Sequence, residues 1–83
     1  MKFLEDILSN VADNKEEKKL LVRNLTQVRL AQDMQVELGV WIDMGYANSF
    51  DRALKEDATI IDGLANEATY EETVAKLKTK IYN

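Results

Sequence analysis

The chain of 83 residues contains no cysteine, no histidine and no proline, and only three glycines. Without cysteine it has no disulfide, thiolate metal ligand or cysteine nucleophile, which is compatible with a reducing compartment. Without histidine it lacks the commonest general base and the commonest metal ligand of proteins. We therefore expect a cytoplasmic protein that uses no cofactor.

Long apolar runs and a basic charge balance are also missing. The runs Leu20–Val22 and Val40–Ile42 are typical, whereas a membrane span needs about twenty apolar residues. The N-terminus turns acidic at Glu5 and lacks the apolar core of a signal peptide. The formal net charge is −4, and the lysines at 15, 18 and 19 are interrupted by glutamates, which disfavours a phosphate backbone as partner. We expect neither a membrane nor a nucleic acid as partner.

Apolar residues at helical spacing are abundant in this chain, which is 46% hydrophobic and 31% charged. Period-two alternation, which would indicate strands, extends over no more than a few positions. Clusters of Asn, Asp, Ser and Gly divide the chain into four helical stretches, at about 2–11, 15–44, 48–66 and 70–81. The sequence predicts an all-α protein with a single helical domain over residues 1–83, folded as a small bundle of three to four helices.

The stretch from Lys15 to Met44 predicts one long central helix, because its apolar residues recur in steps of three and four. Gly39 could end this helix early, but the periodicity continues past it, and Gly45 is the better stop. A helix over about residues 15–44 would be roughly 45 Å long, whereas a domain of this size is about 30 Å across. Part of the helix would then need cover from a second copy or a partner protein.

Carboxylates are the remaining candidates for chemistry. Asp33 with Glu37, or Asp57 with Asp62, could meet on a helix face or across a turn, although nothing near them in the sequence would raise a pKa or supply a third ligand. The glycines are too scattered for a phosphate-binding loop, and the spacing of an EF-hand is not present. We expect no catalytic residue, no bound metal and no small-molecule substrate.

An apolar and aromatic cluster lies at the end of the predicted long helix. Its members are Leu38, Trp41, Ile42, Met44 and Tyr46, and Trp, Tyr and Met are enriched at protein interfaces. A single tryptophan in a small bundle is more often part of the core. The two interpretations coincide if a second copy completes the core. These five residues are the candidate interface.

The favoured function is that of a small acidic, non-enzymatic protein that binds protein. It would form homo-oligomers and could also inhibit or scaffold a partner protein. One alternative is an acidic decoy that occupies a nucleic-acid-binding protein, which Glu67, Glu71 and Glu72 motivate. Another is a metal protein that uses carboxylates alone. No motif in the chain selects a family or identifies the partner.

Overall fold

The computed structural model describes residues 15–82. This part of the chain contains five helices: α2 (Lys15–Asp33), α3 (Leu38–Asp43), α4 (Tyr46–Glu56), α5 (Thr59–Leu64) and α6 (Tyr70–Tyr82). The described residues include no strand, which confirms the prediction of an all-α helical bundle. The helix expected over about 2–11 lies outside the described residues.

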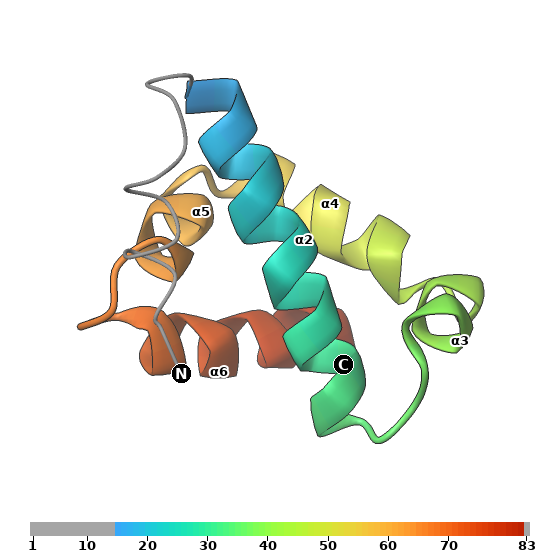
Figure 1. Ribbon diagram of the computed structural model, residues 1–83. Coiled ribbons are helices and arrows are strands. Elements are labelled where there is room, and N and C mark those ends of the chain that lie inside the picture. Colours follow the sequence, from blue (N-terminus) through green and yellow to red (C-terminus); the bar gives the residue numbers. More distant parts are fainter. Residues whose placement is uncertain (1–14, 83) are drawn as a thin grey trace.

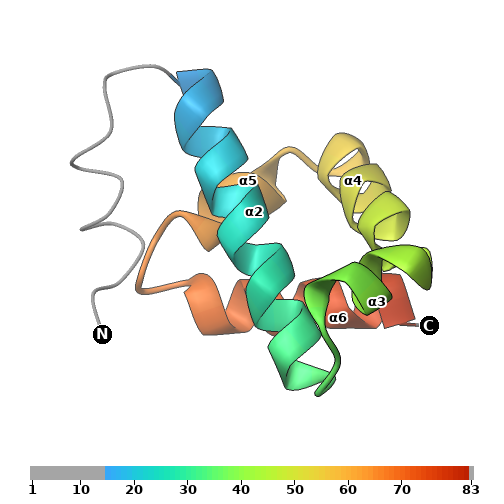
Figure 2. The same cartoon turned by 45° about the vertical axis from the view of Figure 1, so that its right-hand side comes forward.

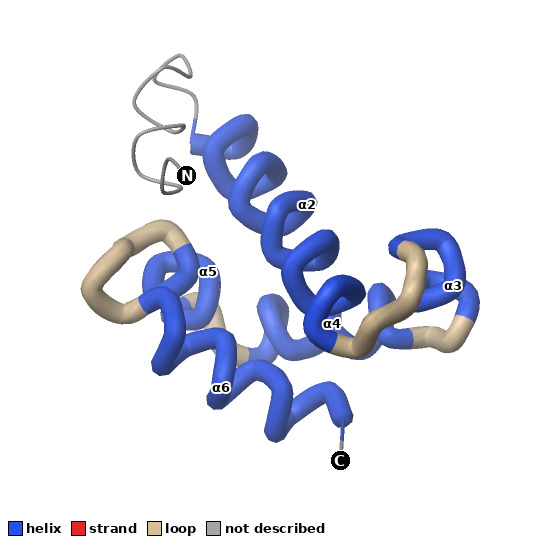
Figure 3. The backbone as a smooth tube through the Cα atoms, turned by 60° about the horizontal axis from the view of Figure 1, so that its bottom comes forward, coloured by secondary structure: helices blue, strands red, loops and turns tan. Residues whose placement is uncertain are grey.

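Helices α4, α5 and α6 pack against one another, with α6 in contact with both of the others. Helix α2 lies across them and contacts α5 and α3 (Figures 1 and 2). Helix α3 packs between the end of α2 and the start of α4. Figure 3 also shows α3 and α5 on opposite sides of the molecule. Within the described residues, the buried side chain of α3 is that of Trp41.

The core is one apolar cluster to which all five helices contribute. Helix α6 follows the expected pattern most closely: it spans Tyr70–Tyr82, and its buried side chains recur at three- and four-residue spacing. This confirms the helix predicted over 70–81. The buried apolar side chains among the described residues are Val22, Leu30, Ala31, Trp41, Phe50, Ala53, Ile60, Leu64, Tyr70, Val74, Leu77 and Ile81.

The central helix is shorter than predicted. Helix α2 ends at Asp33, so the prediction of a continuous helix over about residues 15–44 is wrong beyond that residue. The chain turns through a Schellman motif, in which the amide of Val36 donates to the carbonyl of Ala31 at 3.1 Å and the amide of Gln35 to the carbonyl of Gln32 at 2.9 Å. Gln35 takes the left-handed conformation, with φ of 62°, that glycine usually supplies at this position.

The shorter helix fits within the molecule. The 19 residues of α2 span about 28 Å, and the molecule extends 33 Å along its longest axis, with a radius of gyration of 12.3 Å. The expected shortage of cover along a helix longer than the domain therefore does not arise. Within residues 15–82, the large apolar side chains that stay exposed lie mainly on α3 and at its C-cap residue Met44.

The stretch predicted as one helix over 48–66 is also divided. Helix α4 begins at Tyr46, directly after Gly45, whose φ of 92° is left-handed and ends α3 as expected. Helix α4 ends before Asp57, which is extended and whose carboxylate accepts a hydrogen bond from the amide of Thr59 at 3.0 Å. An Asx turn at Asp57 thus separates α4 from α5.

Candidate functional site

Trp41 fixes α3 to the body of the molecule. Its side chain is completely buried, and its Nε1–H donates to the hydroxyl oxygen of Tyr82 in α6 at 3.1 Å. The ring centroid of Trp41 lies 6.4 Å from that of Phe50, in an edge-on arrangement, and 6.0 Å from that of Tyr46. Tyr46 in turn meets Tyr82 edge-on at 4.9 Å. These rings connect α3, α4 and α6 through aromatic contacts, which hold α3 against the body of the molecule.

The outer part of α3, together with its C-cap residue Met44, is apolar. Leu38, Val40, Ile42 and Met44 have 36%, 46%, 45% and 54% of their surface exposed, and we call these four residues the α3 surface. Because a helical turn takes about 3.6 residues, Leu38 and Ile42 form one row and Val40 and Met44 a second. The other large apolar side chains exposed within residues 15–82 are Leu20 and Val28 on α2. Apolar exposure is thus concentrated on α3.

Carboxylates accompany this apolar surface. Gly39 and Asp43 lie between the two rows, on the side of α3 that points away from the core. Glu37 is exposed at the N-terminal end of α3. Within the described part of the chain, neither Asp43 nor Glu37 forms an ion pair. The sequence has no lysine or arginine between Arg29 and Arg52, so α3 brings negative charge and no positive charge of its own.

The structure separates the five predicted interface residues into two groups. Leu38, Ile42 and Met44 belong to the α3 surface, whereas Trp41 is buried and Tyr46 is half-buried against the core. Trp41 and Tyr46 therefore pack on the core side and do not form part of the α3 surface. Val40, which is as exposed as Ile42, completes the second row. Val40 precedes Met44 by four residues, and this spacing in the sequence indicates that the two side chains lie on the same face of a helix.

Of the four carboxylates considered for chemistry, Asp33 and Asp57 are engaged in ion pairs, whereas Glu37 and Asp62 form none with other described residues. Asp33 accepts from Lys78 at 2.7 Å and from Arg29 at 3.1 Å. The hydrogen bond from Lys78, together with Arg29, lowers the pKa of Asp33 below its usual value. Asp57 is 3.4 Å from the ammonium group of Lys76. Over residues 15–82, no three Asp or Glu side chains gather in a way that could hold a metal ion.

Two arginines fasten α2 to its neighbours. Arg23 donates to both carboxylate oxygens of Asp51 in α4, at 2.6 and 2.9 Å, and this lowers the pKa of Asp51. Arg29 donates to both carboxylate oxygens of Glu71 in α6, at 2.9 and 3.0 Å. Glu71, one of the three acids that motivated the decoy hypothesis, is therefore paired with a cation, which weakens the negative field at that position.

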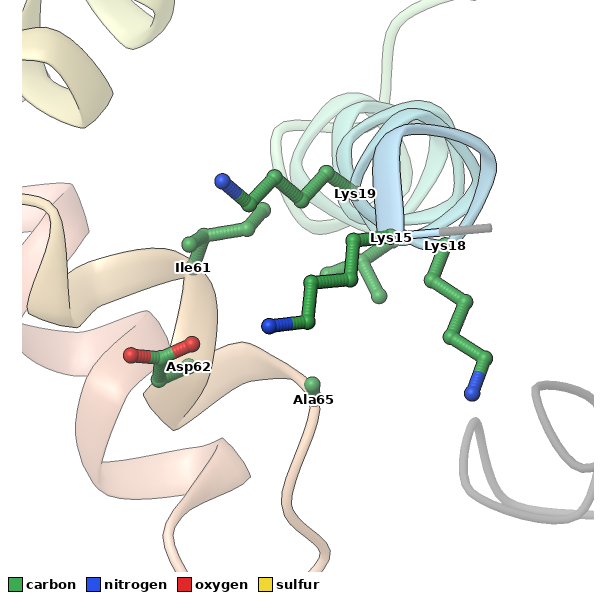
Figure 4. Close-up of a pocket in the computed structure, with 7 residues that line it drawn as sticks. Lys15, Lys18, Lys19, Ile61, Asp62 and Ala65 are labelled. Carbon is green, nitrogen blue, oxygen red and sulfur yellow. The ribbon is translucent and has the colours of Figure 1, made fainter. Parts of the chain in front are cut away.

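A groove of about 460 Å³ lies between α2 and α5. Its apolar part consists of Val22, Ile61 and Ala65, and the charged side chains around it are Lys15, Lys18, Lys19 and Asp62. Figure 4 shows Lys18 pointing away from the groove and Lys15 extending toward Asp62. The groove adjoins the first described residue, and exposed lysines alone do not define a specific anion site. We assign it no ligand.

Within residues 15–82, no helix has the length and apolar character that crossing a membrane requires. Comparison of the chain with protein-family models, with curated proteins and with solved structures finds no match. The functional inference therefore depends on the geometry of the described residues. Among their features, the α3 surface combines exposed apolar area with a rigid support and unpaired charge.

Proposed function

We propose that this chain is a small, acidic, non-enzymatic protein that acts by binding another protein through the α3 surface. The observation that carries this proposal is the exposure of Leu38, Val40, Ile42 and Met44 on a helix whose inner side is anchored by the buried Trp41. Each of these four apolar side chains keeps a third or more of its area in water. Covering them is favourable by roughly 25 cal/mol per Å² of apolar area removed from water.

Rigidity favours the same function. A binding surface that is ordered before the encounter loses less conformational entropy when the complex forms. Helix α3 has only six residues, and an isolated helix of that length is unstable in water. The hydrogen bond from Trp41 to Tyr82 and the ring contacts with Tyr46 and Phe50 hold it in place. The apolar rows are therefore presented in one fixed arrangement.

Three other proposals receive less support. Self-association was expected because the predicted central helix was longer than the domain, whereas α2 fits within the molecule. A carboxylate metal site or an acidic decoy would use acids such as Asp33 and Glu71, which are paired with Lys78 and Arg29. The α3 surface depends neither on an over-long central helix nor on these paired acids. Its exposed apolar side chains favour binding to a partner protein.

Site-specific photo-crosslinking in the source cells tests the proposal. A benzophenone amino acid at Val40 should give an adduct of defined mass, and the adduct should disappear when Ile42→Asp is added. The matched control places the same amino acid at Ala68, which is exposed in the loop between α5 and α6. Absence of an adduct at Val40 in the folded protein would contradict the proposal, and an adduct of twice the chain's own mass would indicate a second copy instead.

A further inference from the structure

We infer that the partner of the α3 surface is a basic amphipathic segment of another protein, folded as a short helix with apolar residues on one face and lysine or arginine beside them. This inference rests on the proposed function and adds the chemistry of the partner. It is carried by the size of the α3 surface and by the charges on it. Each of the two limits what can cover α3.

The size of the surface favours a short segment. Helix α3 has six residues and is therefore about 9 Å long. Its four half-exposed side chains offer a few hundred Å² of apolar area, less than the roughly 800 Å² per partner of a standard protein interface. Because the two rows lie on opposite flanks of α3, a helix of two to four turns can cover one row together with the outer face of α3 beside it. Helical segments commonly bind in this way, through apolar residues three and four positions apart.

The charges on the surface select a basic segment. Asp43 lies on the outer face of α3, three residues from Val40, so a partner that packs on the row of Val40 and Met44 and on the outer face also removes water from its carboxylate. An ionised carboxylate that loses water without gaining a cation is strongly destabilising. The described residues provide no cation for Asp43. The partner must therefore supply a lysine or arginine among its apolar side chains.

A second copy of the chain meets this requirement poorly. In a two-fold dimer the same surface faces itself, so Asp43 and Glu37 of one copy would approach the same acids of the other. Neither copy has a lysine or arginine between Arg29 and Arg52 to separate them. Contact between like charges is unfavourable. A basic helix pairs with the same acids, and the charge pattern favours it over self-association.

Peptide binding tests the inference on the full chain. The probe is a fluorescent helical peptide of about 14 residues, with leucine at helical spacing and lysine at the other positions. A second peptide has glutamate in place of every lysine. We expect the lysine peptide to bind and the glutamate peptide to bind at least about tenfold more weakly, measured by fluorescence anisotropy.

Variants on α3 locate the binding. Val40→Ser should weaken binding of the lysine peptide about tenfold, because an apolar contact is lost. Asp43→Asn should weaken it about threefold, as expected for loss of one exposed charge pair. Glu56→Gln changes the net charge equally at an exposed site at the far end of α4 and should leave the affinity unchanged. Unaltered emission of the buried Trp41 verifies that each variant is folded.

Three results would overturn the inference. Equal binding of both peptides that depends on Val40 would leave the proposed function standing and refute the basic partner. Binding of the lysine peptide that Glu56→Gln weakens as much as Asp43→Asn, and that Val40→Ser does not change, would show general attraction to an acidic chain and would remove α3 as the site. A particle of twice the chain mass in light scattering, restored to a monomer by Val40→Ser, would make a second copy the occupant.

Discussion

Substitution of Gln35 by glycine should stabilise the protein if the chain turns after α2. It should destabilise the protein if a continuous helix passes through this position. In the structure Gln35 is exposed and has φ of 62°. A left-handed conformation costs a residue with a side chain about 1–2 kcal/mol. Glycine avoids that cost but loses about 0.5–1 kcal/mol more backbone entropy on folding. Gln35→Gly should therefore stabilise the protein by roughly 0.5–1 kcal/mol, which raises the melting temperature by a few degrees.

Urea unfolding followed by the fluorescence of Trp41 measures this difference. Gln35→Ala is the matched control, because alanine keeps the left-handed conformation and its cost, so it should leave stability nearly unchanged or slightly lower. In a continuous helix the order reverses: glycine would be about 0.5–0.8 kcal/mol worse than glutamine, and alanine would be the best of the three. A destabilised glycine variant together with a stabilised alanine variant would refute the turn at Gln35.

Three further predictions concern the core, the α5–α6 contact and pH. Thr26 is buried, and its hydroxyl has no hydrogen-bond partner among the described residues. Thr26→Val should therefore leave the free energy of unfolding in urea unchanged or raise it by up to about 1 kcal/mol. A decrease of more than about 1 kcal/mol would show that the hydroxyl is hydrogen-bonded. A Cβ on Gly63 would overlap the side chain of Thr73, so Gly63→Ala should lower the free energy of unfolding by about 1–3 kcal/mol. In a double-mutant cycle, adding Thr73→Ala should restore much of that stability, and additive effects would contradict the close contact. Ion pairs lower the pKa values of Asp33 and Asp51 in the folded state, so the unfolded chain binds protons first as the pH falls. The stability that these two acids contribute is therefore present above about pH 4. It is lost as the pH falls further, through their folded-state pKa values. Urea unfolding from pH 6 to pH 3 should show this decline, and a flat profile would mean that these pairs add nothing.

The helical class and the last helix were predictable because both depend on apolar periodicity. Helix α6 has buried residues at regular three- and four-residue spacing and a clear start after Thr69, and it was predicted to within a residue or two. The end of α3 shortly before Gly45 was predictable as well, because glycine is the usual left-handed residue just after a helix.

The turn at Gln35 was not predictable from local signals. Glutamine is a good helix former, and the apolar period passes through this position without a break. The turn exists because Val36 and Ala31 pack against the core, which offsets the strain at Gln35. That contact belongs to the tertiary structure, and sequence periodicity does not contain it. The same holds for the Asx turn at Asp57.

The candidate site was predictable in its location and only partly in its composition. Both the sequence and the structure point to the segment from Leu38 to Met44. Periodicity alone does not say which face of a short helix turns inward, and Trp41 could have been either an exposed anchor or a core residue. The three aromatic neighbours of Trp41 come from α4 and α6, and they place it in the core and leave the aliphatic residues on either side exposed.

The central claim, that this protein binds through the α3 surface, is tested most directly by following its backbone amide resonances by NMR during a titration with the lysine peptide. The account predicts that the largest shifts fall within residues 37–45, on α3 and its two flanking turns. Shifts confined to residues 15–22 and 61–65, on the two sides of the groove between α2 and α5, with α3 unchanged, would contradict it.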